Sequence, residues 1–414
     1  MIYLVSNKNT TINLNIDLPA SKSISNRALI INALTDNPIP INNLSDSDDT
    51  RVLKEALYSN DTAKFDIGHA GTAMRFLTAY LSRIAGEWEI TGSSRMQQRP
   101  VGILVNALNR LGGNIQYLEK AGFPPLKIYG SHLTGKTLEM DGSVSSQYIS
   151  ALLMIAPVIT NGLTLKLRGE ITSRAYIKMT LMLMARFGIK YDWTEDTITI
   201  PGQNYESINF TVESDWSAAS YWYETLALSD NGRVFFTNLS LDSMQGDAQI
   251  AHWFNHFGIS SVQKDNGVLI TKKEDHNPEK LILNFIENPD MAQTMACLCV
   301  AKKIPFYFSG LKTLKIKETD RIAALKNELA RFGALLSEPL PGELKWSGGI
   351  TRSPAAGTPA VKTYNDHRMA MSFAPMATAG LNMTIEDPLV VRKSYPSFWS
   401  DLKEAGFEIT VRDK

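Results

Sequence analysis

The sequence predicts a mixed α/β protein built from repeated units. Its 414 residues are 44% hydrophobic, which is enough to form cores for two or three domains. A helix-like segment, a glycine and a strand-like run recur together, with the glycine at Gly112, Gly188, Gly258, Gly333 and Gly406. A period of roughly 73 residues is too long for a short solenoid repeat and fits a unit of several helices and strands.

Each of these glycines is expected just beyond the end of a helix, where a left-handed backbone suits a residue without Cβ. Apolar spacing predicts early helices at 24–34 and 50–57, and alternating or β-branched runs predict strands at 12–16, 164–167 and 196–200. Five to six units would divide into two lobes near 212–215. We expect ligands in the cleft between the lobes.

Charge and composition exclude several classes of protein. Lysine plus arginine number 42 and aspartate plus glutamate 42, so no basic excess favours nucleic acid. No apolar run approaches the ~18 residues of a membrane span, and we expect a cytoplasmic protein. Cys297 and Cys299 lie in an apolar run, which predicts buried thiols rather than a disulfide or a metal site.

The segment Ser21–Arg27 follows a predicted strand and opens a predicted helix. Free backbone N–H groups, serine hydroxyls, Lys22 and Arg27 would meet at the positive end of that helix, which suits a phosphate. Ordinary serine capping beside two solvated cations is an equally good interpretation of this segment alone.

Two further segments open helices in the same way. Residues 68–75 contain Gly71, which would let a ligand approach the backbone, and residues 141–148 place hydroxyls and an amide before an apolar helix at 149–158. Each could equally be a plain helix start. Cations that suit carboxylate or phosphate recur in loop-like places, at Arg95, Arg99, Lys317, Arg321, Arg368 and Lys393.

The candidate acid and base groups are Asp290 and Glu318, because carboxylates among cations can exchange protons with a reacting group. By spacing alone, Asp290 is better interpreted as the cap of a helix at 291–300. The carboxylates Asp46, Asp48 and Asp49 are likewise interpreted as caps of the helix at 50–57.

Two motifs predict sites that we reject. Residues 130–137, Gly-Ser-His-Leu-Thr-Gly-Lys-Thr, match the P-loop pattern, but a strand-like run follows them and a P-loop must open a helix. His252 and His256 are spaced as metal ligands, yet no third ligand is evident, so we expect a half-buried structural pair.

Taken together, the segments resemble the enolpyruvyl transferase family over nearly the whole chain, from Pro19 to Pro396. The matching blocks are residues 21–27, 70–75, 99–100, 142–147, 243–247, 317–321 and 364–370. Several blocks in the correct order are far more specific than any one of them.

The resemblance implies two lobes, each of three βαβαββ units. One lobe would be discontinuous, 1–20 plus 213–414, the other would be the insertion 21–212, and the active site would lie in the cleft between them. It also implies a monomer that transfers the enolpyruvyl group of phosphoenolpyruvate to the 5-hydroxyl of shikimate 3-phosphate, releasing phosphate, for the synthesis of chorismate and the aromatic amino acids. No cofactor and no metal would be needed.

The resemblance also implies the site residues. Shikimate 3-phosphate would be held by Lys22, Ser23, Arg27, Ser145, Ser146, Gln147, Ser173, Asp290, Thr313 and Lys317, with Tyr176 nearby and Thr313 where an asparagine is usual. Phosphoenolpyruvate would be held by Lys22, Gly71, Arg99, Gln147, Arg321, Arg368 and Lys393.

The implied chemistry is addition followed by elimination through a tetrahedral ketal. Asp290 would be the base for the hydroxyl, and Glu318 and Lys22 would share proton delivery to the methylene carbon. The alternative is the related transferase that acts on UDP-N-acetylglucosamine. That enzyme usually carries a reactive cysteine on a loop in its first half, where this chain has none.

Overall fold

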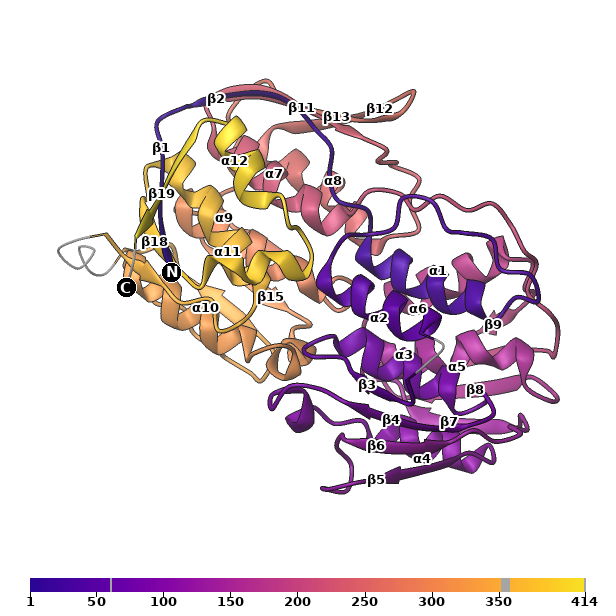
Figure 1. Ribbon diagram of the computed structural model, residues 1–414. Coiled ribbons are helices and arrows are strands. Elements are labelled where there is room, and N and C mark those ends of the chain that lie inside the picture. Colours follow the sequence, from indigo (N-terminus) through magenta and orange to yellow (C-terminus); the bar gives the residue numbers. More distant parts are fainter. Residues whose placement is uncertain (60–61, 351–357, 413–414) are drawn as a thin grey trace. The chain divides into compact units, whose positions relative to one another are not determined.

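The structure, a computed structural model, describes residues 1–59, 62–350 and 358–412 and divides into two compact units (Figure 1). The discontinuous unit combines Met1–Pro19 with Glu213–Lys414, and the continuous unit is Ala20–Val212. None of the described helices has the length and hydropathy that a membrane crossing requires.

One topology recurs in both sheets of the continuous unit: a parallel strand pair, extended by two antiparallel strands. The first sheet has the order β3-β4-β6-β5 and the second β7-β8-β10-β9. The elements are α1 (Lys22–Ala33), α2 (Asp48–Tyr58), β3 (Lys64–Asp66), α3 (Gly71–Leu81), β4 (Glu87–Thr91), α4 (Gly102–Arg110), β5 (Asn114–Tyr117), β6 (Leu126–Tyr129), β7 (Thr137–Asp141), α5 (Ser146–Ile155), β8 (Leu163–Arg168), α6 (Arg174–Arg186), β9 (Asp192–Thr194) and β10 (Thr197–Ile200).

The discontinuous unit has three sheets of related order, β12-β13-β11-β2, β14-β15-β16 and β17-β18-β1-β19. Its elements are β1 (Ile2–Asn7), β2 (Thr11–Ile16), α7 (Trp216–Leu228), β11 (Asn231–Thr237), α8 (Ile250–Trp253), β12 (Ile259–Lys264), β13 (Gly267–Lys272), β14 (Leu281–Asn284), α9 (Ala292–Ala301), β15 (Phe306–Ser309), α10 (Arg321–Leu329), β16 (Leu344–Trp346), β17 (Ala360–Val361), α11 (His367–Phe373), β18 (Met383–Glu386), α12 (Phe398–Glu404) and β19 (Phe407–Arg412).

Short 3₁₀ helices join these elements: η1 (Met96–Gln98), η2 (Ala156–Val158), η3 (Gly246–Gln249), η4 (Phe254–Phe257), η5 (Pro289–Met291), η6 (Lys312–Ile316), η7 (Ala330–Phe332), η8 (Ala374–Ala379) and η9 (Pro388–Lys393). The mixed α/β class expected from the sequence is confirmed by these sheets and helices. In the part of the chain that the structure describes, four of the five sheets have the connection order βαβαββ or its permuted equivalent.

The repeated glycines all adopt the expected left-handed backbone. Their φ angles are 102° at Gly112, 84° at Gly188, 73° at Gly258, 85° at Gly333 and 93° at Gly406. In each repeat the glycine lies after the second helix, where the chain turns to enter the next strand. A side chain with Cβ would be strained there, which explains why the period is visible in the sequence.

Helix α9 packs against α7 and α11 in the core of the discontinuous unit. All its residues from Ala292 to Val300 are buried, so none of its faces is exposed to solvent. Cys297 and Cys299 are 0% exposed, and burial raises the pKa of both thiols. The prediction of buried, inert cysteines is confirmed.

The predicted helix boundaries differ from the observed ones by a few residues. Helix α1 starts at Lys22 rather than residue 24, because Ser21 caps it: the Ser21 hydroxyl accepts a hydrogen bond from the Ile24 N–H at 3.4 Å. Residues 130–137 run into β7 rather than a helix, so the rejection of the P-loop is confirmed. His252 and His256 are both exposed, so the prediction that they are half-buried was wrong.

Candidate active site

The predicted site residues lie in both units, and we describe a half-site in each. In the continuous unit, α1, α3, α5 and α6 pack against one another. The N-terminal ends of α3 and α5 are joined by a hydrogen bond, in which the Gln147 side-chain amide donates to the Thr72 hydroxyl at 3.2 Å. Predicted ligands lie at or near the N-terminal ends of all four helices, where free N–H groups and helix dipoles favour an anion.

Arg27 is a buried cation that contacts only neutral groups. Its guanidinium donates to the Thr180 hydroxyl at 2.7 Å, the Ser150 hydroxyl at 3.2 Å and the Ser23 carbonyl at 2.9 Å. Burial lowers the pKa of Arg27 to about 10, opposed by nearby Tyr176. Among the described residues no carboxylate forms an ion pair with Arg27, so an incoming anion would find an uncompensated positive charge.

Lys22 forms an ion pair with Asp49, with 3.5 Å between Nζ and Oδ2. The expectation that Asp49 acts only as a helix cap therefore needs correction: Ser47 is the N-cap residue of α2, and Asp49 turns instead to the first residue of α1. Asp49 is a half-site residue that the sequence interpretation missed. The two side chains are 27 residues apart, and no local pattern links them.

Gly71 lies directly beneath the guanidinium of Arg99. A Cβ built on Gly71 would approach Arg99 Nη1 to 2.5 Å, closer than any real contact. The Arg99 Nε is buried and has no hydrogen-bond partner among the described residues. Glycine at position 71 therefore allows this cation to lie over the start of α3. Arg75 holds the two segments together, donating to the Gly71 carbonyl at 3.1 Å and the Pro100 carbonyl at 2.9 Å.

The remaining predicted ligands of this unit lie at the starts of α5 and α6. Ser145 is the N-cap of α5 and accepts from the Gln147 backbone N–H at 3.4 Å, and Ser146 is buried. Ser173 is the N-cap residue of α6 and has a left-handed backbone with φ 53°. A non-glycine residue in that conformation is strained, as is common at functional sites.

In the discontinuous unit, Asp290 lies among three cations. Its Oδ1 is 2.7 Å from Arg321 Nη1 and 3.4 Å from Lys317 Nζ, and its Oδ2 is 3.3 Å from Arg368 Nη2. Burial would raise the pKa of Asp290, but the charges of Lys317, Arg368 and Arg321 outweigh it and hold the pKa far below the usual range. The expectation by spacing that Asp290 caps a helix is not met, since α9 begins without a side-chain cap.

Arg321 is the centre of this cluster and is 1% exposed. It donates to Asp366 at 2.6 and 3.3 Å, to Asp290 at 2.7 Å and to Glu318 at 2.8 Å. These bonds use four of the five N–H donors of a guanidinium. Asp366, which also accepts from the Arg368 backbone N–H at 2.9 Å as the N-cap of α11, is a second site residue that the sequence interpretation missed.

Arg368 is oriented by two hydroxyls, one of which is held by a buried carboxylate. The guanidinium donates to Ser217 Oγ at 3.2 Å and to the Tyr221 hydroxyl at 3.4 Å. Ser217 in turn donates to Asp247 Oδ2 at 2.5 Å. Burial raises the pKa of Asp247 to about 6, although Arg368 and Ser217 oppose this. Ser217 lies outside every block that carried the resemblance.

The last predicted residues of this half-site are Thr313, Glu318 and Lys393. The Thr313 hydroxyl is buried without a hydrogen-bond partner among the described residues, and its helix η6 packs against η5, which contains Asp290. A buried hydroxyl left unsatisfied is a candidate ligand contact. Glu318 accepts from Arg321, and Lys393 Nζ donates to the Asn365 carbonyl at 2.5 Å.

Comparisons with known proteins show which family the chain resembles. The sequence model of a protein family, EPSP synthase (3-phosphoshikimate 1-carboxyvinyltransferase), matches residues 6–59 and 53–402. A protein of Bacteroides fragilis strain YCH46 named 3-phosphoshikimate 1-carboxyvinyltransferase is 50% identical over 415 residues, covering 100% of both chains. A protein of the same name from Aliivibrio fischeri strain ES114 is 37% identical and covers 95% of this chain and 97% of its own.

Solved structures share the fold. An EPSP synthase from Acinetobacter baumannii has a TM-score of 0.77 at 19% identity, covering 99% of this chain and 100% of its own. The enolpyruvyl transferase NikO from Streptomyces tendae has a TM-score of 0.72 at 17% identity, and the match covers 100% of this chain and 99% of the NikO chain. With the family match and relatives that align along their full length, the resemblance inferred from the sequence blocks is confirmed, and the chain belongs to the EPSP synthase family.

Proposed function

We propose that this chain is a 3-phosphoshikimate 1-carboxyvinyltransferase. It transfers the enolpyruvyl group of phosphoenolpyruvate to the 5-hydroxyl of shikimate 3-phosphate and releases phosphate, in the pathway to chorismate. It acts in the cytoplasm, as a monomer, on small molecules and without a cofactor. Residues of both half-sites would take part in this reaction.

The observation that carries the proposal is the distribution of charge. Arg27 and Arg99 have no carboxylate partner in the described part of the continuous unit, whereas Asp290 has three cations around it. The two substrates bring two phosphates and two carboxylates. Buried cations need such anions, because an isolated charge is costly away from water.

Substrate binding would also activate Asp290. In the structure the surrounding cations hold its pKa so low that it is ionised but very weakly basic. When Arg368 and Lys317 turn toward phosphate and carboxylate groups, part of the positive charge around Asp290 is neutralised. The pKa of Asp290 then rises toward the range of an effective base.

The reaction then needs one proton removed and one delivered. Asp290 takes the proton of the 5-hydroxyl as its oxygen bonds to C2 of phosphoenolpyruvate, and C3 receives a proton from Glu318 or Lys22. The tetrahedral adduct expels phosphate when C3 loses a proton again. Arg27, Arg99 and Arg368 hold the anions in place, and such positioning accounts for several kcal/mol of rate enhancement.

The alternative, a transferase acting on UDP-N-acetylglucosamine, is disfavoured by the cysteines. Cys297 and Cys299 are fully buried in α9, and their raised pKa values keep the thiols protonated. Reactive cysteines instead lie in exposed, electropositive places.

The first experiment measures phosphate release. Purified protein should release phosphate from phosphoenolpyruvate only with shikimate 3-phosphate present, and without added metal or nucleotide. Release with UDP-N-acetylglucosamine in its place would refute the proposal.

A substitution tests the role of Asp290. Asp290→Asn removes the base but keeps the shape, so kcat should fall by about 10² or more. Binding of shikimate 3-phosphate, followed by calorimetry, should weaken by less than about tenfold, because the surrounding cations remain. Asp265→Asn, an exposed carboxylate in the turn between β12 and β13, is the control and should leave both unchanged. Equal losses in kcat and affinity would make Asp290 a ligand contact only.

A further inference from the structure

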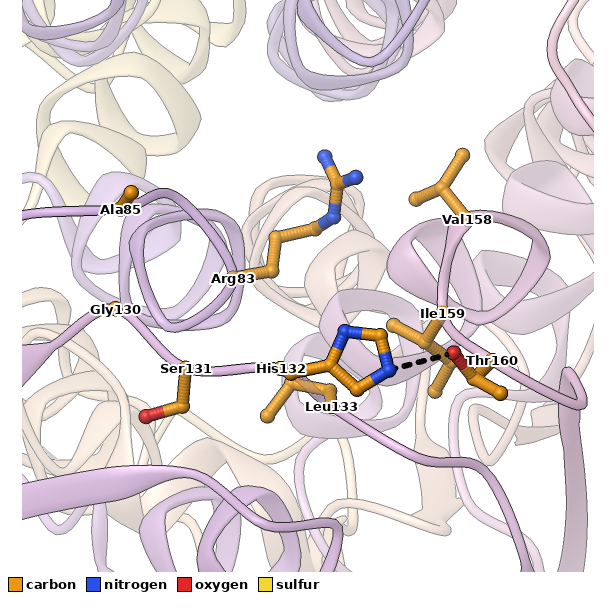
Figure 2. A pocket seen from close by; sticks show the side chains of 9 residues that line it. All are labelled: Arg83, Ala85, Gly130, Ser131, His132, Leu133, Val158, Ile159 and Thr160. Carbon is orange, nitrogen blue, oxygen red and sulfur yellow. Dashed lines mark hydrogen bonds between the residues drawn. The ribbon is translucent and has the colours of Figure 1, made fainter.

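A cavity of about 350 Å³ opens in the continuous unit, apart from the half-site residues (Figure 2). It lies beyond the C-terminal end of α3 and at η2, against the loop between β6 and β7. Its volume is at the lower end of the range of about 300–1,000 Å³ for small-molecule sites. Residues 130–133 of the loop begin the segment that resembles a P-loop, and the proposed reaction has no use for them.

The cavity contains a cation without a counter-charge. Arg83 lies two residues beyond α3 and is half-buried, and Figure 2 shows its side chain projecting between Ala85 and Val158. Throughout the described ranges no carboxylate forms an ion pair with its guanidinium, and the group that interacts with it electrostatically is the Tyr80 phenol, which is neutral at pH 7. Burial lowers the pKa of Arg83, and the Tyr80 phenol only partly opposes this.

The remaining wall is part polar and part apolar. The His132 ring is tied to the Thr160 hydroxyl at 2.9 Å through Nε2, which leaves Nδ1 for another partner (Figure 2). The Ser131 hydroxyl donates to the Tyr129 carbonyl at 2.9 Å. Leu133, Val158 and Ile159 supply apolar surface. Pockets of this kind use a few polar groups to orient a ligand whose body contacts the apolar wall.

We propose that this cavity binds a small monocarboxylate with a compact apolar body. The fork of one guanidinium matches one carboxylate with two parallel hydrogen bonds. No lysine and no second arginine lines the cavity, so a phosphate dianion would be only half neutralised there. The inference rests on the cavity alone and does not depend on the proposed reaction.

The site lies at the far ends of helices that carry half-site residues. Gly71 and Thr72 begin α3, and Arg83 follows its end, so roughly 15 Å of helix separates them. Helix ends of this polarity disfavour an anion by about two- to fivefold. A charge-assisted bond to Arg83 favours an anion by about ten- to a hundredfold. Arg83 therefore outweighs the helix ends, and the cavity favours an anion.

The test follows the full-length protein by NMR with labelled isoleucine, leucine and valine methyl groups. Benzoate, as the probe, should shift the Val158 and Ile159 methyl resonances saturably. Benzamide, which has the same shape without the charge, should bind at least tenfold more weakly. Equal affinity for the two probes, or shifts confined to the methyl groups beside Arg27, would overturn the proposal.

Substitutions identify the cation. Arg83→Gln should weaken benzoate binding at least tenfold, and Arg83→Lys, which keeps the charge without the fork, should fall between Arg83→Gln and the parent. Arg110→Gln, an exposed arginine at the end of α4, should have no effect. Unfolding temperatures of all three variants confirm that they fold. Unchanged affinity in Arg83→Gln, or displacement of benzoate by inorganic phosphate, would contradict the assignment.

Discussion

Asp247 is a carboxylate whose burial works against stability. It is 6% exposed, it accepts from Ser217 and it lies near Arg368. Burial raises its pKa from 3.8 to about 6 despite these partners. The folded protein therefore binds the proton more tightly than the unfolded chain does. Proton binding by Asp247 therefore adds to the free energy of unfolding. The added stability is fully present below pH 3.8, falls as the pH rises from about 4 to 6, and is lost above pH 6.

Asp247→Asn should stabilise the protein at neutral pH. A shift of about two pKa units corresponds to about 3 kcal/mol, so above pH 7 the variant should exceed the parent by up to that amount. Near pH 4 position 247 is largely neutral in both the parent and the variant, so their free energies of unfolding should become equal. Urea unfolding at several pH values measures these free energies.

The same variant should lose activity, because Arg368 loses one of the negative charges near it and keeps that of Asp290. We expect kcat/KM for phosphoenolpyruvate to fall while the free energy of unfolding rises, which is the usual opposition between a strained site and stability. The exposed Asp242→Asn in the same unit is the control. A stability difference that does not change between pH 4 and 8 would show that Asp247 is not the titrating group.

The sequence names candidate site residues one at a time but not the residues that hold them. Arg27 was named as a ligand and Asp290 as a base, but the hydroxyls of Ser150 and Thr180 that hold Arg27 lie 123 and 153 residues away. Ser217 is 151 residues from Arg368. Hydrogen bonds over such separations are set by packing, and no local spacing encodes them.

At the scale of single elements, the starts of the helices carry most of the local signal. Ser21, Asp320 and Asp366 each accept a backbone N–H as the N-cap of α1, α10 and α11. Of these three, only Ser21 was interpreted from the sequence as a possible helix cap. Capping and ligand binding use the same residue types, which is why these segments remained ambiguous until several were considered together. Helix α3 differs because its N-cap, Ala70, has no side chain that could cap it.

Gly71→Ala tests the start of α3. The backbone of Gly71 is not left-handed, so alanine fits the helix, but the new Cβ would force the guanidinium of Arg99 to move. Losing one charge-assisted contact costs about 1.5–3 kcal/mol, so the KM for phosphoenolpyruvate should rise about ten- to a hundredfold. Steady-state kinetics with each substrate varied in turn provide the measurement.

The control is Gly202→Ala in the same unit, where an added Cβ would meet nothing nearer than 3.6 Å. It should change neither KM. The unfolding temperature of Gly71→Ala should match that of the parent, since only a flexible side chain must move. A large loss of affinity for shikimate 3-phosphate in this variant would mean that the helix start itself had been displaced.

At the scale of the whole molecule, the N-terminal 19 residues complete the discontinuous unit. Strand β1 pairs with both β18 and β19, and β2 pairs in parallel with β11. Periodicity predicted the repeated units, yet the early strand at 12–16 gave no sign that it pairs with a strand beginning at Asn231. The discontinuous boundaries came from the resemblance to a family, because strand pairing across 200 residues leaves no local pattern.

The chain leaves the discontinuous unit and returns to it at one place, since the Asp215 N–H donates to the Pro19 carbonyl at 2.9 Å. Residues 20–212 therefore form an insertion with neighbouring ends, and such segments often fold alone. We expect the isolated segment to unfold cooperatively in urea, because its helices and two sheets bury their own apolar residues.

The isolated segment should bind shikimate 3-phosphate weakly through Arg27 and release no phosphate from phosphoenolpyruvate, since Asp290 and Arg368 lie in the other unit. Calorimetry compares it with the same segment carrying Arg27→Gln, which should lose the binding. Turnover by the segment alone would place the base among its own carboxylates, of which Asp49, beside Lys22, is the first to test. If the segment folds but does not bind shikimate 3-phosphate, Arg27 holds this substrate only when residues of the discontinuous unit also contact it.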